Sequence, residues 1–327
     1  MSFNPPSSPF LFAPANTLGS LFGLGSVSTP VANWQYVRRR FAKFLGNLEP
    51  TAEQHADGTT KHGGVRAALN RAYYGHSSET ANSLLIGSWG KNTRVRPSRD
   101  VDLIFLLPAS VHGRYEQRSG NRQSALLQEV RNVLADTYTQ TTIRGDGQVV
   151  VIPFNSIPVE VAPGFRCTDG NIIVCDTNSG GTYKISSAEA EANELAVSDA
   201  RWTGNTRALV RMLKSWQRQN NVQLKSFQIE HLAIFFLNQW QYSHHDLFWY
   251  DWMIRDFFGF LVQQPNKWFV MPGNNEVIHL GAEWLFQAQR AQKYATAACE
   301  NEHDNYEATA GAEWQKIFGT AVPALVS

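Results

Sequence analysis

The sequence predicts a fold of the α/β (α+β) class, in which a mixed β-sheet with its own helices is joined to a second lobe made of helices. Short runs of β-branched and aromatic residues, bounded by turn residues, lie between positions 83 and 185. After position 187, apolar residues recur at helical spacing almost to the end of the chain. We therefore expect a first lobe over residues 31–200 and a C-terminal helical lobe over 201–327, with a cleft between them.

The N-terminal part begins with an arm and continues with two helices. Residues 1–30 are rich in Pro, Ser, Gly and Asn without periodicity, which is typical of a flexible arm. The first helical face consists of Trp34, Val37, Phe41, Phe44 and Leu45. Thr51 and Gln54 have the spacing of a capping box, so a second helix is expected to begin there. Its core-facing residues are Val65, Leu69 and Tyr73.

The middle of the chain is expected to form the sheet. The β-prone runs are Ser83–Ile86, Val101–Leu107, Val149–Phe154, Ile157–Ala162, Ile172–Val174 and Thr182–Ile185. A helix over Ser124–Asp136 interrupts them, and the polar pair Asn155-Ser156 is typical of a tight turn. The later helices are expected over Thr206–Gln219, Phe227–Gln239, Asp246–Leu261 and Ala282–Ala298. The aromatic residues Phe248, Trp249, Trp252, Phe257 and Phe258 have helical spacing and are expected in the core.

Composition excludes several classes of protein. A hydrophobic fraction of 43% and a charged fraction of 17% are typical of a globular protein. The sequence shows no secretory signal pattern and no apolar run of membrane-spanning length, so we expect a cytoplasmic monomer without membrane contact. Three scattered cysteines (Cys167, Cys175 and Cys299) are too few for a disulfide framework or a zinc site. A net charge of +1 argues against strong nucleic-acid binding.

Two aspartates mark the most informative stretch. Asp100 and Asp102 lie two residues apart at the start of an apolar strand, so their side chains point to the same face while Val101 and Leu103 point to the core. Neighbouring carboxylates repel one another unless a cation lies between them. Mg²⁺ binds one or two carboxylates together with phosphate oxygens, so this pair predicts a nucleotide–metal site.

Two further features complete the predicted site. Glu160 stands alone on one face of its strand, between Val159 and Val161, and would add a third carboxylate for a two-metal mechanism. The Gly87-Ser88 turn can approach a polyphosphate closely and offers backbone N–H groups and a hydroxyl. It is not a Walker loop, because Asn92 follows Gly90-Lys91 where that motif has Ser or Thr.

These motifs together resemble a known enzyme family. The motifs are Gly-Ser-Trp-Gly-Lys-Asn-Thr, the Asp-Val-Asp strand, Val-Glu-Val-Ala-Pro, Leu213-Lys214-Ser215-Trp216 and the segment from Leu224 to Glu230. They are similar to those of the bacterial cGAS/DncV-like nucleotidyltransferases, in the polymerase-β-like superfamily, over roughly residues 35–320. Such enzymes make cyclic oligonucleotides for anti-phage (CBASS) signalling.

The resemblance implies an activity and assigns residues to it. It implies joining of NTPs (ATP, GTP or pyrimidine nucleotides) into a cyclic di- or trinucleotide, with two Mg²⁺ or Mn²⁺ ions and release of pyrophosphate. Asp100, Asp102 and Glu160 would be the catalytic metal carboxylates, although the family more often has Asp at the third position. Gly87, Ser88, Lys214 and Ser226 would contact the triphosphate. The product would activate an effector protein of the same defence system.

Alternatives stay open at this point. An RNA-tailing or linear oligoadenylate-type transferase would share the fold but need a basic groove, and a catalytically silent nucleotide-binding module would keep the cleft alone. The pattern around Lys214 is equally typical of a surface lysine. Ser226 is equally placed to be the N-cap of the helix that follows it. The arginines before the strand, Arg94, Arg96 and Arg99, are phosphate ligands or solvated charges. Tyr183 and Trp202 stack on a base or belong to the core.

Overall fold

The computed structural model describes residues 33–327, so the predicted arm lies outside the described residues. A seven-stranded mixed sheet has the order β1-β2-β5-β4-β3, with β6 paired to both β5 and β7. Its strands are β1 (Ser83–Leu85), β2 (Val101–Leu106), β3 (Arg144–Asp146), β4 (Val149–Ile152), β5 (Val159–Arg166), β6 (Ile172–Asp176) and β7 (Thr182–Ile185). Only the central pair β2–β5 is parallel, and the other pairs are antiparallel. The mixed α/β class predicted from the sequence is confirmed.

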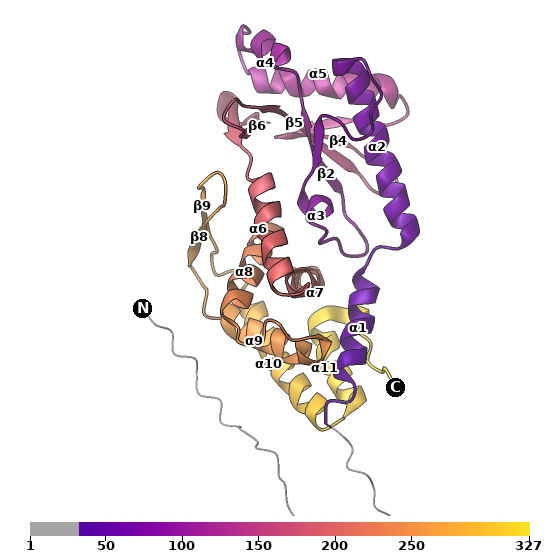
Figure 1. The fold of residues 1–327 in the computed structure, drawn as a ribbon, viewed down its shortest axis with the longest axis vertical. Helices are drawn as coiled ribbons and strands as arrows, with labels where there is room; N and C mark the ends of the chain where they lie inside the picture. Colours follow the sequence, from indigo (N-terminus) through magenta and orange to yellow (C-terminus); the bar gives the residue numbers. More distant parts are fainter. Residues whose placement is uncertain (1–32) are drawn as a thin grey trace, which may run out of the picture. The chain divides into compact units, whose positions relative to one another are not determined.

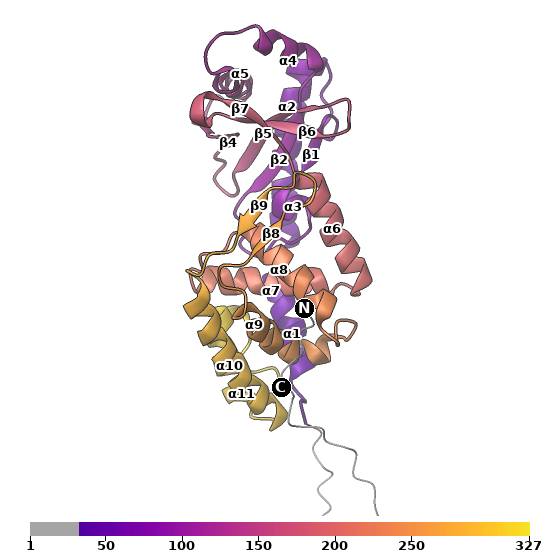
Figure 2. The ribbon, with the colours of Figure 1, turned by 90° about the vertical axis from the view of Figure 1, so that its left-hand side faces the viewer.

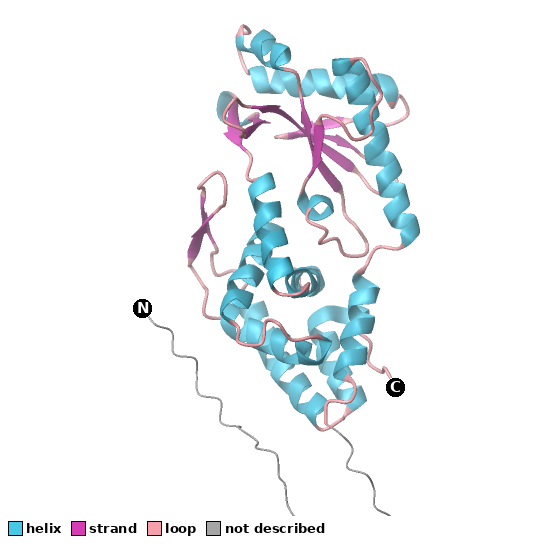
Figure 3. Ribbon diagram, in the orientation of Figure 1, coloured by secondary structure: helices cyan, strands magenta, loops and turns pink. Residues whose placement is uncertain are grey.

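Helices cover one face of this sheet and build the rest of the chain (Figures 1 and 3). Those beside the sheet are α2 (Ala52–Tyr74), α3 (Gly87–Gly90), α4 (Ala109–Glu116) and α5 (Arg122–Thr137). The others are α1 (Val37–Leu48), α6 (Ala188–Arg201), α7 (Asn205–Gln219), α8 (Ser226–Gln239), α9 (Tyr250–Leu261), α10 (Leu285–His303) and α11 (Glu307–Phe318). A small hairpin, β8 (Trp268–Val270) and β9 (Val277–His279), stands apart from the sheet.

Strand alternation separates the two faces of the sheet. Val101 and Leu103 of β2 and Val159 and Val161 of β5 are fully buried against α2 and α5. The opposite face carries Asp102 and Glu160, which are only half-buried, followed along the strands by a small apolar cluster. The central strands therefore present carboxylates on the face that α5 leaves open.

The predicted helix signals appear where the sequence places them. The Gln54 N–H donates to the Thr51 hydroxyl (3.2 Å), and the Thr51 N–H donates to the Gln54 side-chain oxygen (3.0 Å), which confirms the capping box. The helix ends at Gly75, whose φ of 72° is left-handed. Capping at both ends explains how a helix of 23 residues persists with a weak apolar stripe.

A second hydrophobic core lies among the helices and brings together the two ends of the described chain. Phe41 and Phe44 of α1 pack against Trp314 and Phe318 of α11, with ring centroids 5.3 Å and 4.8 Å apart respectively. Figure 1 shows α1 among the C-terminal helices, and Figures 1 and 2 show α6 running from the sheet toward them. The first helix of the predicted first lobe thus contributes its apolar face to the core of the helical lobe.

Several elements were not predicted, and one prediction about the core was partly wrong. Elements for which no range was predicted are α3, α4, β3, α6, β8, β9 and α11, which are short or lack a strong apolar stripe. Phe257 and Phe258 are buried as expected, but Phe248 is exposed and Trp249 and Trp252 are only half-buried. The reason is that Asp246 caps a 3₁₀ turn over Leu247–Trp249, so the helical face expected from Asp246 onward begins only at Tyr250. Within the described residues, none of the helices combines the length and apolar character needed to cross a membrane.

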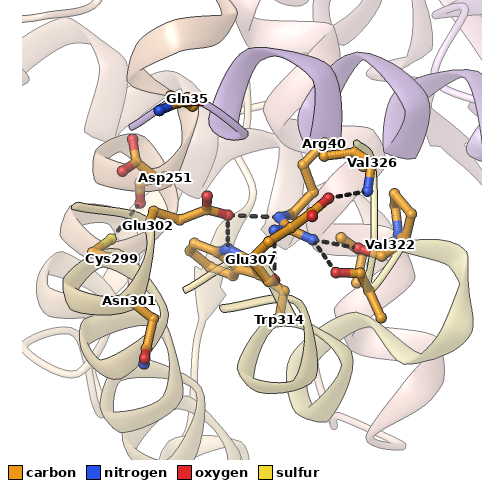
Figure 4. Close-up of polar contacts among 12 residues, drawn as sticks. Gln35, Arg40, Asp251, Cys299, Asn301, Glu302, Glu307, Trp314, Val322 and Val326 are labelled. Carbon is orange, nitrogen blue, oxygen red and sulfur yellow. Dashed lines mark hydrogen bonds and ion pairs between the residues drawn. The ribbon is translucent and has the colours of Figure 1, made fainter. Parts of the chain in front are cut away.

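Buried polar groups tie α1 to the C-terminus (Figure 4). Arg40 and Glu302 are both fully buried and form an ion pair of 2.6 Å, and the Trp314 indole N–H donates to the same carboxylate (3.1 Å). Arg40 also donates to the carbonyl oxygens of Pro323 (2.7 Å) and Ala324 (2.8 Å). A buried arginine needs several acceptors, and the C-terminal segment supplies them.

Asp251 of α9 lies in the same region without comparable partners. Its carboxylate accepts one bond, from the Trp252 N–H (2.8 Å), while the other oxygen has no partner among the described residues. Burial raises the pKa of Asp251 to about 8, and the charge of Glu302 acts in the same direction. The carboxyl is therefore protonated in the folded protein near neutral pH.

We expect Asp251→Asn to stabilise the protein more at pH 8 than at pH 5. The unfolded chain releases this proton above pH about 4, whereas the folded protein keeps it until pH about 8. Since the folded state binds more protons across this window, the wild-type free energy of unfolding falls as pH rises. The variant lacks that term, which changes by up to about 1.4 kcal/mol per pH unit. Urea unfolding of both proteins at several pH values measures it, and identical pH dependences would contradict the prediction.

Candidate active site

The three predicted carboxylates lie at the start of the two central strands of the sheet. Asp102 of β2 is in direct register with Glu160 of β5, and Asp100 immediately precedes β2. Because β2 and β5 are parallel and adjacent, the side chains of Asp102 and Glu160 project to the same face. The spacing within one strand and the pairing of two strands thus gather these acids.

This gathering has an electrostatic consequence. Burial, together with repulsion by Asp100 and Glu160, raises the pKa of Asp102 to about 7. The pKa values of Asp100 and Glu160 are raised as well, in each case first by burial. Positive charge beside these carboxylates would relieve the repulsion between them.

Gly87 and Ser88 form the turn that faces these acids. Gly87 opens the short helix α3 with a φ of 55°, and a Cβ atom there would overlap the Asp102 carboxylate. Only glycine combines this backbone conformation with that close approach. The Ile86 N–H donates to the Asp102 carbonyl (2.9 Å), which fixes the turn against the strand.

A cavity of about 390 Å³ opens between this turn and the helices α7 and α8. Of the predicted site residues, Gly87, Ser88, Asp100, Asp102, Lys214 and Ser226 line it. Glu160 is not among the lining residues, although it pairs in register with Asp102. The volume is within the range of small-molecule sites. The predicted cleft therefore exists, and it brings together residues that are far apart in the sequence.

The structure distinguishes between the alternatives that the sequence left open for Lys214 and Ser226. Lys214 is not a surface residue, because its side chain is only 7% exposed. Ser226 is not the N-cap of α8, because Lys225 takes that position and Ser226 is the first helical residue. Its place at a helix N-terminus on the cavity wall suits an anionic ligand.

A cationic stripe on α7 holds the loop that joins the turn to the carboxylate strand. Arg207 donates to the Lys91 carbonyl (2.9 Å) and Arg211 to the Asn92 carbonyl (3.1 Å). Further along α7, Lys214 donates to the Thr93 hydroxyl (2.7 Å) and Arg218 to the Pro97 carbonyl (2.9 Å). These positions recur at helical spacing, so one face of α7 fixes the loop 91–97.

Of the other residues considered from the sequence, some line the cavity and some do not. Arg99 lines the cavity, whereas Arg94 lies over the Trp89 ring (4.2 Å) and Arg96 donates to the Asn47 carbonyl (2.8 Å). Tyr183 packs on Phe165, and Trp202 is buried against His244, so neither lines the cavity.

Sequence reasoning missed the cavity-lining residues Lys91, Thr93, Glu191, Gln217, Arg218, Phe227 and Glu230. Four of them lie inside the motifs quoted above, and that position is the signal that could have identified them: Lys91, Thr93, Phe227 and Glu230.

The donor set suits a hard divalent cation only in part. Among residues 33–327, no group of three His, Cys, Asp or Glu side chains is arranged to hold a metal by itself. Mg²⁺ in nucleotide sites takes one or two carboxylates and completes its shell with phosphate oxygens and water. Asp100 and Asp102, which both line the cavity, fit that requirement together with a bound triphosphate.

Comparison with known proteins identifies the family. Residues 36–198 match the model of the Second Messenger Oligonucleotide or Dinucleotide Synthetase (SMODS) domain. The chain belongs to this family. It is therefore a nucleotidyltransferase of the SMODS type, and Gly87, Ser88, Asp100, Asp102 and Glu160 fall inside the matched region. None of the curated proteins matches the sequence.

Solved structures share the fold of this SMODS protein at low sequence identity. Vibrio cholerae DncV cyclic AMP-GMP synthase, in complex with the linear intermediate 5′ pppA(3′,5′)pG, has a TM-score of 0.66 at 12% identity, covering 89% of this chain and 97% of that one. The CD-NTase CdnG from Bradyrhizobium diazoefficiens, in complex with GTP, has a TM-score of 0.64 at 10% identity, covering 88% and 96%. CdnC from E. coli MS115-1, with ATP, has a TM-score of 0.59 at 16% identity, covering 87% and 98%.

Proposed function

We propose that the chain joins NTPs into a cyclic di- or trinucleotide and releases pyrophosphate at each step. One observation carries the proposal: a single cavity is lined by the Gly87-Ser88 turn, two adjacent carboxylates and a lysine from the opposite wall. This combination offers separate places for a triphosphate and for a reacting phosphoryl group. The family supports a second-messenger product, and the product would act in the cytoplasm on an effector protein of an anti-phage defence system.

Each wall of the cavity has its own proposed role. Gly87 and Ser88 cradle the triphosphate through backbone N–H groups and a hydroxyl, while Lys214 and the N-terminus of α8 at Ser226 bind it from the other side. These contacts would hold the phosphoryl group in line with the attacking hydroxyl, which is the main source of rate in phosphoryl transfer. ATP and GTP are the substrates to test first, because similar structures contain ATP or GTP.

Asp100 and Asp102, with Glu160 beside Asp102, are the residues proposed to hold two Mg²⁺ or Mn²⁺ ions. When bound, such ions lower the pKa of the attacking hydroxyl and stabilise charge on the transferring phosphoryl group. The three acids are half-buried, so water is partly excluded from the carboxylates that would hold the ions.

Incubation with ATP, GTP, CTP and UTP and Mg²⁺ or Mn²⁺, followed by phosphatase and mass spectrometry, tests this function. We expect a phosphatase-resistant product whose mass is that of a closed ring of nucleoside monophosphate units. Linear, phosphatase-sensitive oligomers would contradict cyclisation and favour an oligoadenylate or tailing enzyme. Absence of any product, with NTP binding intact, would contradict the proposal in favour of a nucleotide-binding module.

A further inference from the structure

A buried carboxylate already binds two lysines that line the cavity. Glu230 of α8 is only 5% exposed, and its two oxygens accept from different lysines. One oxygen lies 2.8 Å from the Lys214 ammonium, and the other lies 2.7 Å from the Lys91 ammonium. All three residues line the cavity that is proposed to bind the triphosphate.

Both lysines also donate to other residues. Lys91 donates a second bond to Glu191 of α6 (2.5 Å). Lys214 donates to the Thr93 hydroxyl (2.7 Å) and, at 3.5 Å, to the Thr93 carbonyl. An ammonium group has three N–H donors and no acceptor. Each lysine thus keeps at most one donor for a ligand while Glu230 and its neighbours hold the others.

The charges in this part of the cavity balance. Two lysines face the two carboxylates of Glu230 and Glu191, so the charges of these four side chains cancel one another. Burial raises the pKa of Glu230, but Lys214 and Lys91 outweigh it and hold the pKa below its ordinary value. Glu230 is therefore ionised, and it repels any anion that approaches the same lysines.

We propose that Glu230 is an internal counter-anion that competes with the triphosphate for Lys91 and Lys214 and thereby sets the affinity for nucleotide. Before nucleotide binds, the carboxylate keeps both ammonium groups extended along the cavity wall and compensates their charge. Binding of the triphosphate requires at least one lysine to exchange Glu230 for a phosphate oxygen. This inference rests on the proposed function, because it takes the cavity lysines to be triphosphate ligands.

The competition predicts that removing the charge of Glu230 tightens binding. We expect Glu230→Gln to bind ATP and inorganic tripolyphosphate about tenfold more tightly than wild type, measured calorimetrically in EDTA so that no divalent cation contributes. Glu191→Gln removes the less buried carboxylate, so we expect it to disturb folding less, and it should tighten binding by about threefold. Glu194→Gln, on the same helix but paired with His231 (3.5 Å), is the matched control and should change affinity by less than about twofold.

The outcomes separate this inference from the proposed function. Unchanged or weaker binding of tripolyphosphate by both Glu230→Gln and Glu191→Gln, with normal binding by wild type, would overturn the competition and leave the function standing. Failure of wild type to bind ATP with Mg²⁺ present as well as in EDTA would contradict the proposed function. A loss of the Glu230→Gln effect when Lys214 is also replaced by Met would assign the competition to that lysine.

Discussion

Asp102→Asn is expected to lower the rate of product formation by about a thousandfold or more. The substitution keeps the shape of the side chain and removes the negative charge at the acid that faces both Asp100 and Glu160. Loss of one carboxylate from a two-metal site removes several kcal/mol of transition-state stabilisation, and about 4 kcal/mol corresponds to this factor. Product formation from labelled ATP and GTP under saturating Mg²⁺ measures the effect.

The stability of the same variant should move in the opposite direction. Burial and repulsion raise the pKa of Asp102 to about 7, so the free energy of unfolding of the metal-free protein falls as pH rises from about 4, where the unfolded chain ionises, to about 7. We therefore expect the melting temperature of Asp102→Asn at pH 8 to equal or exceed that of wild type. Asp136→Asn, an exposed position on α5 beyond the other face of the sheet, is the control and should leave activity unchanged. Wild-type activity in Asp102→Asn would rule out the two-metal assignment.

The carboxylate strand could be predicted from the sequence because its signal is local. Val101 and Leu103 alternate with Asp102, and such alternation fixes the face of each side chain once the strand is buried on one side. The same holds for Thr51 and Gln54, whose hydrogen bonds span three residues. The direct register of Asp102 with Glu160 could only be hypothesised, because the parallel pairing depends on the sheet order.

The cluster of Lys91, Lys214 and Glu230 could not be predicted, because its members are distant in sequence. Lys91 and Glu230 are 139 positions apart, and Lys214 stands in an amphipathic pattern that suits a surface lysine equally well. The deciding fact is tertiary: α7 and α8 pack together, and the loop 91–97 runs across both. Buried charges of this kind follow no local periodicity, so only the structure reveals them.

Gly87→Ala is expected to lower activity by about a hundredfold while the protein stays folded. The added Cβ would overlap the Asp102 carboxylate, so either the turn or the acid has to shift. A displacement of about 1 Å in a positioned catalytic group costs on the order of a hundredfold in rate. The φ of 55° adds strain for any residue with a side chain, worth about 1 kcal/mol of stability.

A second glycine separates the overlap from the backbone strain. Gly120 has a φ of 80°, but a Cβ atom there meets nothing within 4 Å. Gly120→Ala should therefore lower the melting temperature through backbone strain alone and leave product formation unchanged. If both variants lose activity equally, strain of the backbone rather than contact with Asp102 is responsible. If Gly87→Ala keeps full activity, the turn does not position the triphosphate against the acids, and the proposed role of Gly87 is wrong.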